Sequence, residues 1–130
     1  MPREESLYPA DWLRIAEKDW KRVEGLLEED PELAGFCLQQ AVEKFLKAYL
    51  ISQGWKLQRT HDLQALLNAA LDYDPSLELY RGVCQRITGF YLLERYPLIA
   101  EVSLTGQEVH DAWQGVKGLI EKLRGVISGK

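Results

Sequence analysis

Five polar side chains share one strip of an otherwise apolar stretch, residues 36–51, and their types suit the binding of an anion. The strip holds two lysines, one carboxylate and two amides: Lys44, Lys47, Glu43, Gln39 and Gln40. Lysine ammonium groups hold phosphate oxygens through charge-assisted hydrogen bonds. Most lysines are simply solvated, but a helix that is apolar on both flanks favours a groove or an interface for these two.

Further candidates follow the strip. The loop after Gly54 brings an aromatic ring and three potential cations together: Trp55, Lys56, Arg59 and His61. His61 and Asp62 have an equally ordinary role as the cap of the next helix. Tyr91 lies on an apolar face and is either a core residue or a platform for a base, and Arg95 could bond the last carbonyls of its helix. The candidate ligand-binding residues are therefore Lys44, Lys47, His61, Asp62, Tyr91 and Arg95.

The spacing of residues gives little support to a metal site or a phosphate-binding loop. No His or Cys pair has zinc-ligand spacing, neither histidine follows a Glu by three residues, and no Gly-rich phosphate loop is present. We therefore expect no metal and no cofactor. Cys37 and Cys84 lie inside apolar patterns, which favours small buried hydrophobes over a redox pair. Asp19 is either a solvated edge residue or a carboxylate that faces the two lysines.

The hydrophobic periodicity predicts the helices that position these residues. Four long helices and one short one are expected at residues 9–29, 31–53, 62–71, 75–95 and 105–127. Asp30-Pro31 and Asp74-Pro75 mark two helix starts, and Thr105 with Glu108 has the spacing of a capping box. No strand pattern, repeat or linker is visible. The sequence predicts an all-α, antiparallel four-helix up-and-down bundle with one additional short helix, as a single domain over residues 1–130.

The composition of the chain limits the kinds of partner that it can bind. The chain has 130 residues, a hydrophobic share of 46% and a net charge of -4. Nonspecific coating of DNA or RNA depends on a basic surface, so only a local basic patch is compatible with nucleic-acid binding. No targeting or membrane segment is evident, and we expect a cytoplasmic protein.

Three segments together resemble one family. The runs GFCLQQAVEKFLKAYLISQG, THDLQALL and YLLERYP, followed by a last amphipathic helix, are similar to the HEPN family of small helical bundles. The resemblance covers nearly the whole chain. It implies a homodimer, often produced beside a separate minimal nucleotidyltransferase subunit, with roles in nucleotide binding or toxin-antitoxin pairs.

The resemblance also bears on catalysis. Many HEPN proteins are metal-independent ribonucleases whose signature is an Arg followed four to six residues later by a His. Arg95 fits the Arg position, but residues 96–102 contain no histidine. Because the usual proton carrier is missing, we expect a subunit that binds a nucleotide or RNA without cutting it.

Two alternatives stay open. One is a ribonuclease toxin that uses Arg95 with another base, such as His61. The other is a protein-interaction module that uses the apolar segment 98–104 and the edges of the last two long helices.

Overall fold

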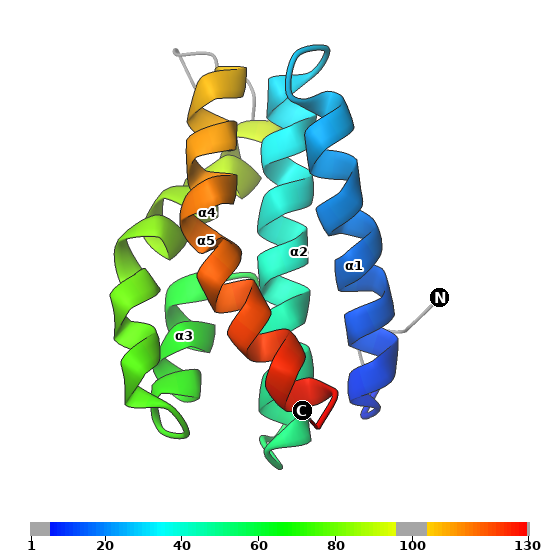
Figure 1. Cartoon of the computed structure of the whole chain (residues 1–130), viewed down its shortest axis with the longest axis vertical. Coiled ribbons are helices and arrows are strands. Elements are labelled where there is room, and N and C mark those ends of the chain that lie inside the picture. The colour runs from blue at the N-terminus through cyan, green and yellow to red at the C-terminus, as the bar shows by residue number, and fades with distance from the viewer. Residues whose placement is uncertain (1–5, 96–103, 130) are drawn as a thin grey trace.

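The chain folds as an antiparallel helical bundle (Figure 1). The structure, a computed structural model, describes residues 6–95 and 104–129, and describes only the backbone of residues 92–95. These ranges contain five α-helices, one 3-10 helix and no strand: α1 (Pro9–Leu26), α2 (Pro31–Ser52), α3 (Leu63–Leu71), η1 (Pro75–Tyr80), α4 (Arg81–Arg95) and α5 (Gly106–Ile127). The four longer helices alternate in direction, with α1 and α4 running opposite to α2 and α5. The predicted all-α bundle with one additional short helix is confirmed.

Helix α2 is the centre of the bundle because it is apolar on both flanks. It contacts α1, α3, α4 and α5, and Leu38, Phe45 and Leu46 are completely buried. All the other described helices contribute side chains to the same hydrophobic cluster. Burying a large apolar side chain typically stabilises a fold by about 1.5–3 kcal/mol. The polar strip of α2 is therefore held in place by a core on either side of it.

Local hydrogen bonds fix the helix ends that the sequence predicts. The Asp30 side chain accepts from the Leu33 backbone N–H, which caps α2, and Thr105 with Glu108 forms a complete capping box at the start of α5. At the other end of α2, Gly54 adopts φ +91°. Only glycine enters this left-handed region without strain, so the chain turns there into the loop that carries His61.

Two helix boundaries differ from the prediction. Helix α1 ends at Leu26 rather than Glu29, and residues 27–29 form a turn that is closed by the Asp30 N–H, which donates to the Leu26 carbonyl. The predicted helix 75–95 is divided, since η1 begins with tight turns in which the Leu77 N–H donates to the Asp74 carbonyl. Such 3-10 turns are frequent at helix starts. The tighter turns bury Leu77 and leave Leu79 81% exposed.

Replacing glycine by alanine is expected to have opposite effects on stability at two positions. A Cβ at Gly106 would collide with the Leu27 carbonyl oxygen, a backbone atom that has no room to move, whereas a Cβ at Gly82 would meet nothing within 4 Å. We expect Gly106→Ala to lower the free energy of unfolding by about 1–3 kcal/mol. Gly82→Ala should raise it by about 0.5–1 kcal/mol, because glycine is a poor helix former. Urea denaturation measures both, and a Gly106→Ala variant that is as stable as the wild type would contradict the packing described at Gly106.

Candidate functional site

A groove of about 530 Å³ lies between α1 and α2. Its walls come from α1, α2 and the loop before α3, so three separate segments of the chain define it. The lining residues are Trp12, Arg14, Ile15, Lys18, Asp19, Arg22, Phe36, Gln40, Glu43, Lys44, Lys47 and His61. The groove is large enough for a small ligand or for part of a larger one.

The groove is positively charged although the chain is acidic. Five lysine and arginine side chains but only two carboxylates line it, in a protein of net charge -4. Arg14, Lys18 and Arg22 follow one another at four-residue intervals on the exposed rim of α1, which corresponds to a rise of about 6 Å each. Lys18 makes no hydrogen bond or ion pair within residues 6–95 and 104–129. The rim therefore presents a row of cations to a negatively charged ligand.

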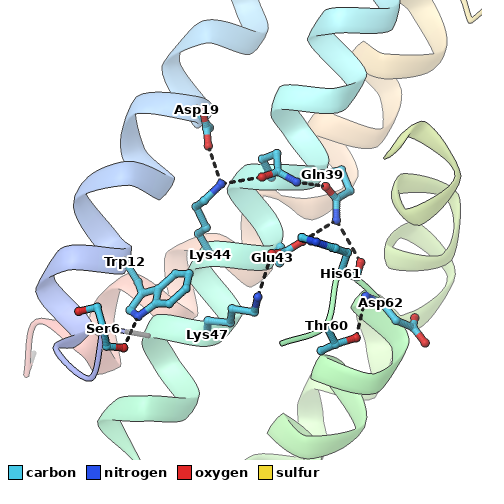
Figure 2. Close-up of polar contacts among 11 residues, drawn as sticks. Ser6, Trp12, Asp19, Gln39, Glu43, Lys44, Lys47, Thr60, His61 and Asp62 are labelled. Carbon is cyan, nitrogen blue, oxygen red and sulfur yellow. Dashed lines mark hydrogen bonds and ion pairs between the residues drawn. The ribbon is translucent and has the colours of Figure 1, made fainter. Parts of the chain in front are cut away.

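A buried carboxylate lies at the centre of the groove wall (Figure 2). Glu43 Oε2 accepts from Lys47 Nζ at 2.9 Å, and Glu43 Oε1 lies 3.0 Å from Gln39 Nε2 and 2.9 Å from His61 Nδ1. The side chains of Glu43 and Lys47 are only 3% and 4% exposed. Removing an isolated charge from water is strongly unfavourable. Each of these two charges is therefore stabilised mainly by the other.

Lys44 extends the same network toward α1. Its Nζ donates to Gln40 Oε1 at 2.7 Å and to Asp19 Oδ2 at 3.3 Å, and Gln40 Nε2 donates to Gln39 Oε1 at 2.7 Å. Asp19 also accepts from Arg22 Nη1 at 3.1 Å. Polar contacts thus run without a break from α1 across α2 to the loop at residue 61 (Figure 2). The network fixes the positions of both lysines before any ligand arrives.

Both lysines keep donor capacity in this arrangement. An ammonium group has three N–H donors, and Lys44 uses two of them for Asp19 and Gln40 while 17% of its side chain stays exposed. Lys47 donates to Glu43 and lies 5.3 Å above the centre of the Trp12 ring. The Trp12 Nε1–H in turn donates to the Ser6 carbonyl at 2.8 Å. An anionic oxygen in the groove can accept the remaining N–H groups.

The structure places only three of the six predicted site residues in the lining of the groove. Lys44, Lys47 and His61 are brought together in the groove. Asp62 instead caps α3 by accepting from the Gln64 N–H at 2.9 Å. Tyr91 stacks against Phe36 and His61, with ring centres 5.7 Å and 5.0 Å away. It therefore packs against two residues that line the groove. Arg95 ends α4, and its side chain lies outside the described residues.

Sequence reasoning missed half of the groove. The candidate residues that the sequence predicts do not include Trp12, Arg14, Lys18 or Arg22, which all line the groove. The available signal was the common four-residue spacing of Arg14, Lys18 and Arg22, which places the three cations on one helical face. Asp19, for which two interpretations were open, does face α2 and pairs with Lys44.

The cysteines do not form part of this site. Cys37 and Cys84 are both buried, and burial raises the pKa of the Cys84 thiol to about 12. Cys84 therefore stays protonated and unreactive near neutral pH. In the described part of the chain, no three His, Cys, Asp or Glu side chains cluster in a way that could hold a metal ion. No helix there is long and apolar enough to cross a bilayer.

Comparison with known proteins gives a match to the sequence and a match to the fold. A family model described as the HEPN domain matches residues 9–126. The crystal structure of an archaeal HEPN homologue superimposes with a TM-score of 0.71, covering 92% of this chain and 98% of that chain at 24% identity. At this identity the structural likeness establishes a shared fold. None of the curated proteins matches this chain.

Proposed function

The chain belongs to the HEPN domain family, and from this premise we propose that it binds a nucleotide or RNA in the groove between α1 and α2 without cutting it. It would act as the binding subunit of a two-component system whose other member is a minimal nucleotidyltransferase, of the toxin-antitoxin type. The observation that carries the proposal is the positive charge of the groove around Lys44 and Lys47. Both lysines have N–H groups left for phosphate oxygens.

The buried ion pair supports a binding role. A buried pair such as Lys47 and Glu43 contributes little net stability compared with apolar side chains of the same size, because both charges lose their hydration. A phosphate placed beside Lys47 would satisfy its remaining donors. We infer that the pair is kept to hold an ammonium group ready for an anion.

The shape of the positive surface suits a ligand with more than one phosphate. Arg14, Lys18 and Arg22 lie one helical turn apart along the rim. A polyphosphate or a short strand of RNA can contact several of these cations at once, which a single phosphate cannot do. Affinity that is built from several phosphate contacts falls steeply as salt is added.

Homodimerisation is part of the proposal, with a nucleotidyltransferase subunit as a further partner. The support is the family resemblance together with the exposed apolar side chains of Leu79 and Val126, which lie outside the groove. A contact between subunits would cover such side chains. Light scattering of the purified protein should therefore give twice the monomer mass of 14.9 kDa.

One observation favours a second candidate, a ribonuclease. Glu43 orients His61 through a 2.9 Å contact to Nδ1, and a carboxylate that orients a histidine is a recurring arrangement in general-base catalysis. In this reading His61 would take the proton of a ribose 2′-hydroxyl, and Arg95 would act beside it. The half-exposed ring and the missing histidine after Arg95 make the binding role the better supported one.

A single experiment separates these functions. The purified protein is titrated with ATP and with a single-stranded RNA of twelve nucleotides, and the RNA of the same samples is then run on a denaturing gel. We expect saturable binding and intact RNA. Cleavage that disappears in Arg95→Ala and His61→Phe variants would instead support the ribonuclease. A folded protein that binds neither ligand would refute the proposed function.

A further inference from the structure

His61 is held on several sides, so its ring has a defined position. Its carbonyl accepts from Gln39 Nε2 at 3.1 Å, and its ring stacks on Tyr91 with 5.0 Å between centres and 19° between planes. Its Nδ1 lies 2.9 Å from Glu43 Oε1. The rest of the ring lines the groove, and 47% of the side chain is exposed.

The contact with Glu43 decides which ring nitrogen carries the proton. A carboxylate only accepts hydrogen bonds, so Nδ1 carries the hydrogen and donates it to Glu43. The charge of Glu43 is already balanced by Lys47 at 2.9 Å, and Lys44 also lies in the groove. In the neutral imidazole only one ring nitrogen carries a hydrogen. Nε2, which bonds to no residue within 6–95 and 104–129, is left as a hydrogen-bond acceptor.

The His61 ring lies next to the proposed phosphate position. Lys47 Nζ and His61 Nδ1 each lie 2.9 Å from an oxygen of the same carboxylate, that of Glu43. A phosphate bound to Lys47 would therefore lie close to the His61 ring. Phosphate oxygens are mostly unprotonated near neutral pH and have little to donate to Nε2. The donor that a nucleotide carries next to its phosphate is a sugar hydroxyl.

We infer that His61 Nε2 accepts a hydrogen bond from the ribose 2′-hydroxyl of the ligand, so that the groove prefers RNA to DNA. The inference rests on the proposed function and names the ligand class of the same site. The 2′-hydroxyl is the group by which a protein distinguishes the two nucleic acids at one position. His61 is thus a residue that determines specificity, and Glu43 positions it.

The test compares three probes of one sequence by fluorescence anisotropy. They are 5′-phosphorylated hexauridylate, its 2′-fluoro analogue and hexadeoxyuridylate. The 2′-fluoro analogue keeps the sugar pucker of RNA but has no hydroxyl to donate. The wild-type protein should bind the RNA about threefold to tenfold more tightly than either analogue, the range expected for one hydrogen bond at a half-exposed site.

Two matched variants assign the preference to His61. His61→Phe keeps an aromatic ring beside Tyr91 but removes Nε2, and it should bind all three probes with the affinity that the wild type has for the 2′-fluoro analogue. His110→Phe changes the other histidine, which lies outside the groove, and should keep the preference. A purely structural effect of His61→Phe would weaken the binding of all three probes alike.

The outcomes separate this inference from the proposed function. If the wild type binds all three probes equally well, or if His61→Phe keeps the preference for RNA, the role of His61 is refuted while groove binding stands. If none of the probes binds to the folded protein, both the inference and the proposed function are refuted.

Discussion

Replacing Glu43 by alanine is expected to destabilise the fold by about 3–5 kcal/mol, the range found when one partner of a buried ion pair is removed. Lys47 would remain as a buried charge, since its side chain is 4% exposed and its only described hydrogen bond goes to Glu43. Gln39 and His61 would lose an acceptor as well. Chemical denaturation followed by circular dichroism measures the effect.

A double variant tests whether charge, rather than volume, is responsible. In Glu43→Leu/Lys47→Met both buried charges are replaced by apolar side chains of similar size. Such replacements of whole pairs are often neutral or stabilising, so the double variant should recover most of the stability that Glu43→Ala loses. A double variant as unstable as Glu43→Ala would show that the ion pair does not explain the loss.

Replacing Lys44 by glutamine is expected to weaken the binding of RNA about tenfold or more. A hydrogen bond to a charged group contributes about 1.5–3 kcal/mol, and 1.4 kcal/mol corresponds to a factor of ten. The fold should survive, because Asp19 keeps Arg22 as a partner at 3.1 Å and glutamine retains a polar group beside Gln40. Titration with labelled RNA at fixed salt measures the change.

Two other lysines provide a matched control for this effect. Lys18 and Lys21 are both exposed on α1, but only Lys18 lines the groove. Lys18→Gln should weaken RNA binding and make it less dependent on salt, because one phosphate contact is lost. Lys21→Gln should leave both unchanged. Equal effects of the two substitutions would mean that overall charge, and not the groove, determines binding.

Much of the fold could be predicted because it is encoded locally. The Asp30 cap and the capping box of Thr105 and Glu108 involve residues three positions apart, so the sequence displays them directly. The two apolar flanks of α2 likewise follow from helical periodicity. Placing Lys44 and Lys47 on one polar strip needed no more than the same periodicity.

The rest of the site depends on how the helices pack. That Arg14, Lys18 and Arg22 face α2 is decided by the rotation of α1 about its axis, which its broad polar surface leaves open. Tyr91 meets His61 only because α4 lies beside the loop before α3. The four-residue spacing of Glu43 and Lys47 is that of a helical ion pair, but the burial of Lys47 could not be predicted, because lysines are seldom buried and its burial depends on how other segments pack against it.

The most direct test of the central claim is a map of where the ligand binds. Amide chemical shifts of ¹⁵N-labelled protein are recorded during titration with 5′-phosphorylated hexauridylate. If the groove is the binding site, the largest changes fall on residues 12–22, 36–47 and 60–61, while the middle of α5 remains unaffected. Saturable changes confined to α4 and α5, with none between α1 and α2, would contradict this account.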